Sequence, residues 1–125
     1  RLSGSIRYNL LIGNPDASEE IIHNAIKTAA AEFAYTLPKG LDTDCFEKGL
    51  GLSEGQAQRI AVARALLRPG KVLLLDEFSS ALDKETEEIL MQRLAEKAAA
   101  EALTVIMITH RTEILKYCTQ TINIQ

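Results

Sequence analysis

The sequence predicts an α/β protein in which a helical lobe, residues 1–70, precedes part of a parallel sheet, residues 71–125. Two short apolar runs, "VLLL" and "TVIMI", have the length and composition of strands that are buried on both faces. A long helical pattern lies between them, and the order strand, helix, strand predicts parallel pairing with a right-handed crossover. The first half of the chain shows helical patterns only, which indicates a separate lobe ahead of the sheet.

The first half divides into a short apolar stretch, two helices and a loop. The apolar stretch, residues 3–13, runs into the turn residues Gly-Asn-Pro-Asp. Ser18 is a typical N-cap residue, and acidic residues in the following turn predict an amphipathic helix that extends to about Ala30. A second short helix is expected over residues 31–37, and residues 41–51 have the composition of a loop.

The second half alternates helices and strands. Apolar side chains recur at helical spacing in two segments, and a Pro-Gly pair ends the first of them. The predicted elements are a helix over Ser53–Leu67, a strand over Val72–Leu75, a helix over Asp83–Ala100, a strand over Thr104–Ile108, a short helix over Thr112–Cys118 and a last strand over Thr121–Ile124.

Composition narrows the class of protein. Hydrophobic residues make up 46% of the chain and charged residues 25%, as in an ordinary globular domain. The net charge of −3 and the pI of about 5.4 give no basic surface for nucleic acid, so no nucleic-acid partner is expected. Cys45 and Cys118 have no metal-ligand spacing and are expected to be free thiols in a reducing compartment. No apolar run approaches the roughly 18 residues that a membrane span needs.

Polar residues follow both predicted inner strands. Asp76 and Glu77 come after the first strand, and Thr109 and His110 come after the second. Parallel strands collect chemistry at their carboxyl ends, where a carboxylate pair suits Mg²⁺. Glu77 could orient an attacking water there and His110 could donate to a terminal phosphate, as phosphoryl transfer requires. Each residue alone has a plainer interpretation, a capping acid or an ordinary turn histidine.

Taken together, these motifs resemble those of the nucleotide-binding domain of an ABC transporter. "LSEGQAQRIAVARALL" is similar to the LSGGQ-like signature motif and its helix, "VLLLDE" to the Walker B strand, "SSALD" to the D-loop and "ITH" to the switch histidine. "SGSIRYNL" and "LPKGLDTDCFEKG" resemble the exporter branch. The resemblance implies the C-terminal half of the domain: a helical signature subdomain followed by half of a P-loop NTPase (RecA-like) core without the Walker A strand and loop.

The resemblance assigns three residues to the ATP that this domain itself would hold. It implies that Asp76 holds Mg²⁺ through water and that Glu77 is the general base or water-positioning group. It also implies that His110 contacts the γ-phosphate. ATP and Mg²⁺ are therefore the expected substrate and metal.

Four further residues would serve the interface with a second nucleotide-binding domain. The resemblance implies that Ser53, Gly55 and Gln56 present a hydroxyl and backbone N–H groups to ATP held by that partner. This role is physically reasonable, because the free backbone N–H groups at a helix N-terminus attract an anion such as a phosphate. Asp83 would lie at the dimer interface, where it could also cap the following helix.

An exporter-type domain implies further partners and a location. The region of Glu47 resembles the loop that touches a transmembrane domain, and the domain would work at the cytoplasmic face of a membrane. ATP hydrolysis would then be coupled to transmembrane transport. Two alternatives remain open, a non-transport ABC-type ATPase that acts on DNA or ribosomes and a degenerate regulatory domain that binds ATP without turnover.

The sequence departs from the family pattern at three places. Glu54 stands where Gly is common, and it is expected to point away from the phosphate because a carboxylate there would repel it. Phe78 replaces a small residue or Pro, and Ala57 replaces a basic residue. None of these changes removes a catalytic group.

A phosphate cradle of the form G-x-x-x-x-G-K-[ST] is the missing part. The one Gly-Lys pair, Gly70-Lys71, is followed by Val72 and lacks the first glycine. The chain also begins at Arg1 without a methionine, which suggests a piece of a larger protein. The isolated chain is therefore expected not to hydrolyse ATP. Its last strand would have an unpaired edge, so that segment should be disordered or should pair with another chain.

Overall fold

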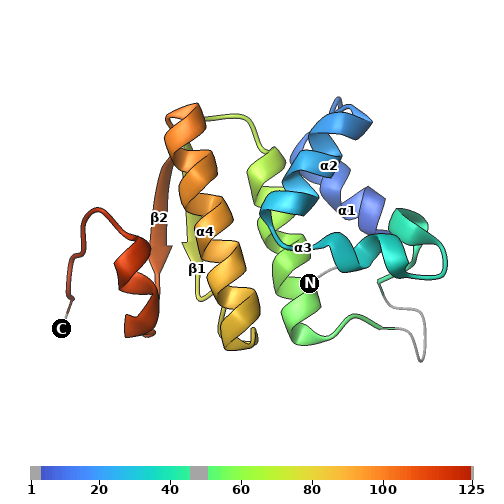
Figure 1. Cartoon of the computed structure of the whole chain (residues 1–125). Coiled ribbons are helices and arrows are strands. Elements are labelled where there is room, and N and C mark those ends of the chain that lie inside the picture. The colour runs from blue at the N-terminus through green and yellow to red at the C-terminus, as the bar shows by residue number, and fades with distance from the viewer. Residues whose placement is uncertain (1–3, 46–50, 125) are drawn as a thin grey trace.

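A computed structural model of the chain describes residues 4–45 and 51–124 (Figure 1). The α-helices are α1 (Ile6–Gly13), α2 (Glu19–Thr28), α3 (Glu54–Leu67) and α4 (Lys84–Glu101). The two strands are β1 (Val72–Asp76) and β2 (Thr104–Ile108), and the short 3-10 helices are η1 (Glu32–Thr36), η2 (Gly40–Asp42) and η3 (Thr112–Tyr117). The predicted helices and the two predicted inner strands therefore form, with ends shifted by a few residues.

The N-terminal apolar stretch folds as a helix, which the sequence pattern did not predict. Ser5 caps α1, because its side chain accepts a hydrogen bond from the backbone N–H of Tyr8. Ser18 caps α2 in the same way through the N–H of Ile21, as predicted. Ile6 and Leu10, one turn apart, are fully buried. The helical spacing of these two side chains is what places α1 against the core.

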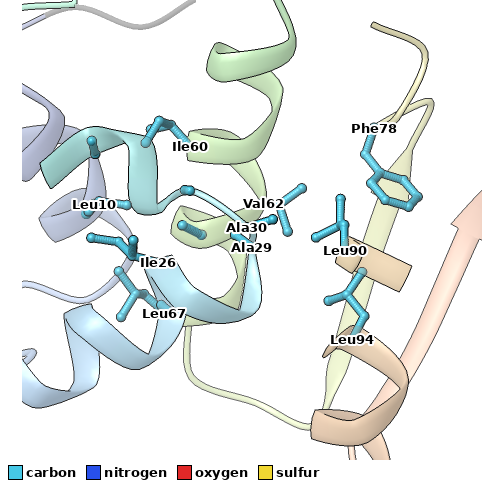
Figure 2. Packing of buried hydrophobic residues seen from close by; sticks show 14 of the residues in the cluster. Leu10, Ile26, Ala29, Ala30, Ile60, Val62, Leu67, Phe78, Leu90 and Leu94 are labelled. Carbon is cyan, nitrogen blue, oxygen red and sulfur yellow. The ribbon is translucent and has the colours of Figure 1, made fainter. Parts of the chain in front are cut away.

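The core is one continuous cluster with α3 at its centre (Figure 2). On one side of α3, Ile26 and Leu10 pack near Ile60, and on the other side Val62 faces Leu90 of α4. Phe78, the unusual residue after the acid pair, is 6% exposed and belongs to this cluster. The residue that departs from the family pattern therefore fills the core rather than the site. The predicted boundary at residue 70 stays a prediction.

The two strands pair in parallel, as predicted. Val72 pairs with Thr104 and Asp76 with Ile108, so the strands are level along their whole length. Helix α4 connects them and lies over one face of the sheet (Figure 1). The carboxyl ends of β1 and β2 consequently meet at one edge.

The prediction that both strands are buried on both faces is wrong. Leu73 and Leu75 are buried under the helices, whereas Val72 and Leu74 are 65% and 61% exposed. In β2, Ile106 and Ile108 are each 49% exposed. Side chains alternate across a strand, and the described helices cover one face, so every second residue is left open. The exposed apolar side chains of the two strands therefore form a sheet face that nothing in the described part of the chain covers.

The strand predicted over Thr121–Ile124 does not form. These residues are irregular, and Ile122 and Ile124 are 76% and 86% exposed. The sheet of the described residues contains β1 and β2 only, and no hydrogen-bonded neighbour is present for a third strand. A strand needs a paired edge, which explains why its β-rich composition is not sufficient.

Three other sequence-based expectations concern single features. Cys45 and Cys118 are free thiols, as predicted, and burial raises the pKa of the Cys45 thiol. The Glu47 region, expected to touch a transmembrane domain, lies outside the described residues. Among residues 4–45 and 51–124, no helix has the length and apolarity to cross a bilayer.

Candidate active site and signature helix

The two predicted catalytic side chains lie together at the carboxyl edge of the sheet. The backbone N–H of Glu77 donates to the carbonyl of Ile108 at 2.9 Å, which extends the strand pairing by one residue. His110 follows two residues later, and its Nε2 lies 3.3 Å from Oε1 of Glu77. The His110 side chain is 93% exposed and that of Glu77 41% exposed. Both are thus available to a ligand that approaches this edge.

Glu77 has a strained backbone. Its φ of 49° is in the left-handed region, which a residue with a Cβ adopts at a cost of roughly 1–2 kcal/mol. The described residues contain only two other such non-glycine positions, Ala30 and Ala102, and Ala102 is a helix C-cap. Strain of this kind persists where the surroundings hold it and is common at functional sites. At this turn the chain leaves the direction of β1, and the Glu77 carboxylate lies next to His110.

Asp76 is the last residue of β1, and its side chain is exposed beside Glu77. The described residues contain no group of three or more His, Cys, Asp or Glu that could enclose a metal ion. Mg²⁺ does not require such an enclosure, because it keeps several waters and is bound by one or two carboxylates together with substrate phosphates. One exposed carboxylate at a strand end therefore fits Mg²⁺ bound with a nucleotide.

The signature segment forms the first turn of α3. Ser53 is the N-cap, and it forms a capping box with Gln56: the Ser53 Oγ accepts from the Gln56 N–H at 3.1 Å, and the Gln56 Oε1 accepts from the Ser53 N–H at 2.9 Å. Ser53 keeps its hydroxyl hydrogen for another acceptor. Because the Gln56 N–H is already used, the backbone donors that α3 can offer to an anion are those of Glu54 and Gly55. Glu54 is exposed, and its predicted direction stays a prediction.

Gly55 is also a packing residue. A Cβ at this position would lie 2.8 Å from the carbonyl oxygen of Ala81 and 3.3 Å from Leu82. One turn on, the Gln58 side chain donates to Ser80 Oγ at 2.9 Å and accepts from the Ala81 N–H at 3.2 Å. The start of α3 is therefore fastened to residues 79–83, the D-loop-like segment. Gln58 is not among the residues predicted from the sequence, although its i+3 spacing from Gly55 places both on one helix face.

Asp83 caps α4. Its Oδ1 accepts from the N–H of Thr86 at 2.7 Å. This backbone hydrogen bond, helped by the Thr86 hydroxyl, holds the pKa of Asp83 below its ordinary value of 3.8. The capping role is established by this contact, and the proposed role at a dimer interface is compatible with it.

Replacing Asp83 by Asn is expected to lower stability at neutral pH but not in acid. The folded state lowers the pKa of this carboxylate, so its contribution is present above the unfolded pKa and is lost as the pH falls through the lower, folded value. Urea unfolding of the chain should therefore show an Asp83→Asn deficit at pH 7 that disappears well below pH 3.8. A deficit that persists unchanged in acid would contradict this explanation.

A cavity of about 490 Å³ lies elsewhere. Its lining includes Leu67, the last residue of α3, together with Gly70, Val72 and Leu103 at the amino ends of the strands. Glu77 and His110 lie at the opposite, carboxyl ends of the strands, so this cavity is not part of the candidate site. Lys71 also lines this cavity, and its Nζ donates a hydrogen bond to the carbonyl of Glu101 at 3.2 Å.

Comparisons with known proteins identify the family of the chain. A family model described as "ABC transporter" matches residues 5–80. The chain is 48% identical over 120 residues to the glutathione/L-cysteine transport system ATP-binding/permease protein CydD of Haemophilus influenzae, covering 95% of this chain and 20% of that protein. It is 49% identical over 110 residues to P-glycoprotein 14 of Caenorhabditis elegans, covering 87% of this chain and 8% of that protein.

A solved structure has the same fold over most of the chain. The ATP-bound structure of a bacterial Atm1-family ABC exporter superposes with a TM-score of 0.80 at 40% identity, covering 91% of this chain and 20% of that chain. The chain thus spans a fifth or less of the length of these relatives. Because the family model matches more than half of it, the chain belongs to the ABC transporter family, as part of an ATP-binding domain whose relatives include exporters.

Proposed function

We propose that this chain is part of the ATPase domain of an exporter, in which ATP hydrolysis drives a substrate across a membrane. One observation carries the proposal: Glu77 and His110 approach to 3.3 Å at the carboxyl edge of a parallel sheet, with the exposed carboxylate of Asp76 beside them. The exporters among the relatives support the transport coupling. The transported substrate is not part of the proposal.

The three residues divide the chemistry of phosphoryl transfer among them. Glu77 accepts a proton from the attacking water or orients that water, and its strained backbone fixes the direction of its carboxylate. His110 donates a hydrogen bond to the terminal phosphate, which can reach its ring because that side chain is 93% exposed. Asp76 would hold Mg²⁺ through water, and that ion would supply positive charge against the phosphates.

The start of α3 serves a second ATP molecule, one gripped by a partner nucleotide-binding domain. Ser53 offers a hydroxyl, the first turn of α3 offers the free N–H of Gly55, and the positive end of the helix dipole favours an anion. Gln56 contributes by closing the capping box that shapes this turn. Asp83 would lie at the interface with the partner. In this arrangement the working unit is a dimer of nucleotide-binding domains at the cytoplasmic face of the membrane, and a transmembrane domain is contacted near Glu47.

The protein that contains this chain is expected to hydrolyse ATP, whereas the isolated 125-residue chain is not. No G-x-x-x-x-G-K-[ST] cradle is present in the chain to grip the phosphates, and the α3 donors act on a partner's nucleotide. Phosphate release from both proteins, measured with Mg²⁺ and ATP, tests the proposal. Turnover by the isolated chain would contradict the division of the site. ATP binding without turnover by the whole protein would contradict the enzyme assignment and favour a regulatory domain.

A further inference from the structure

An ion pair joins the residue that follows the exposed histidine to a buried carboxylate of α4, and the Arg111 side chain in it is 35% exposed. Glu87, in the first turn of α4, is 2% exposed, and Arg111 is the residue that follows His110. Nη2 of Arg111 donates to Oε1 of Glu87 at 3.0 Å, and Nε lies 2.7 Å from Oε2. The second contact is an ion pair by its distance, and neither of its two buried atoms has a hydrogen-bond partner. The guanidinium thus meets the carboxylate at two points.

The chain on both sides of His110 is fixed. The N–H of Arg111 donates to Oγ1 of Thr109 at 2.9 Å, which closes a tight turn around the histidine. Three residues after Arg111, Ile114 is 1% exposed and anchors η3 in the core. Only the His110 side chain is left outside, at 93% exposure. The arginine is therefore the residue next to His110 that ties this turn to α4 through a side-chain contact.

Burial of Glu87 is not explained by stability alone. Taking this carboxylate out of water costs free energy that its attraction to the partly exposed Arg111 has to offset, so the ion pair is weak evidence for a stabilising role. A contact that fixes a direction is a better explanation, because two-point arginine binding specifies orientation as well as distance. Glu87 is also one turn from Asp83, which caps the same helix at the end facing the D-loop-like segment.

We propose that Glu87 and Arg111 are positioning residues: they hold the turn that carries His110 against the first turns of α4, so that the histidine moves with that helix. The inference rests on the proposed function, because it gives the pair a role only if His110 meets a phosphate. Through this ion pair, a shift of the first turns of α4, which follow the D-loop-like segment, would also shift His110.

The test uses the full protein that contains this chain and measures steady-state ATP hydrolysis. Glu87→Leu keeps the buried volume and releases Arg111, so kcat should fall about 10-fold while KM for ATP stays within about twofold. In a His110→Ala background the same substitution should lower kcat by less than about twofold, because residues that act through one group are not additive. Arg111→Lys, which keeps the charge and loses the two-point contact, should fall between the parent and Glu87→Leu.

Glu88→Gln is the matched control, since Glu88 lies on the same helix and pairs with Lys116 of η3 at 3.8 Å, but in an exposed position. It should leave kcat unchanged. A thermal unfolding curve shows whether each variant is folded, and Arg111→Lys carries the test if Glu87→Leu is not. Unchanged kcat in a folded variant, or a loss that adds in full to that of His110→Ala, overturns the positioning role. The parent protein in the same assay separates the outcomes: absence of ATP turnover there contradicts the proposed function itself, whereas turnover by the parent that Glu87→Leu and Arg111→Lys leave unchanged contradicts only the positioning role.

Discussion

Replacing Glu77 by Gln in the full protein is expected to lower ATP turnover by about 100-fold or more, in the range expected for loss of a general base. The amide has nearly the same shape as the carboxylate, so the substitution leaves the left-handed backbone of residue 77 in place. It removes only the ability to accept a proton from water. ATP binding should persist, because the other proposed nucleotide contacts do not involve this side chain.

Two measurements make this result specific. Nucleotide binding, followed with a fluorescent ATP analogue, should remain within about threefold of the parent, while phosphate release falls by the factor expected for a lost base. Glu96→Gln makes the same chemical change at an exposed position of α4 and should leave turnover unchanged. If Glu77→Gln turns over ATP at a rate close to that of the parent, Glu77 is not the general base. The proposed site would then contain His110 and Asp76 but no assigned base.

The position of the carboxyl edge of the sheet could be predicted because short, contiguous stretches of the sequence define where each strand ends. An apolar run followed at once by Asp76 and Glu77 defines a strand and its end, and the same holds for the run before His110. Parallel order follows from one intervening helix, and parallel order brings the two ends to one edge. The 3.3 Å contact between Glu77 and His110 is the consequence. Chain order and strand length thus place the two residues at one edge, whereas the left-handed turn at Glu77 could not be predicted from them.

Other features depend on contacts between distant residues, and the sequence pattern did not predict them. The open face of the sheet could not be foreseen, because Leu74 is as apolar as Leu73 and only the layer above decides which is covered. The pairing of Gln58 with Ser80, and of Glu87 with Arg111, joins residues more than 20 positions apart. α1 was missed for a different reason: Ser5 is a typical N-cap, and the signal was present but short.

The glycine of "LSEGQ" now has two explanations, and Gly55→Ala distinguishes them. If Gly55 serves only to offer its N–H to a phosphate, alanine offers the same N–H and should be tolerated. In a helix alanine would even stabilise by roughly 0.5–1 kcal/mol, because glycine loses more conformational freedom on folding. If Gly55 is required for close packing, the added Cβ meets the carbonyl oxygen of Ala81 at 2.8 Å, and backbone cannot move aside as a side chain can.

The distance favours the second explanation. Overpacking of this kind costs about 1–3 kcal/mol, which exceeds the gain in helix propensity. Gly55→Ala is therefore expected to lower the free energy of unfolding by about 1–2 kcal/mol, and in the full protein to lower ATP turnover by about 10-fold through a displaced D-loop-like segment. Gly51→Ala is the control, because a Cβ there has no atom within 4 Å among the described residues. Equal stability and turnover of the two variants would show that the N–H is the whole role of Gly55. A loss confined to Gly55→Ala would show that the close approach of this glycine to Ala81, together with the hydrogen bonds of Gln58, holds the signature helix against the D-loop-like segment.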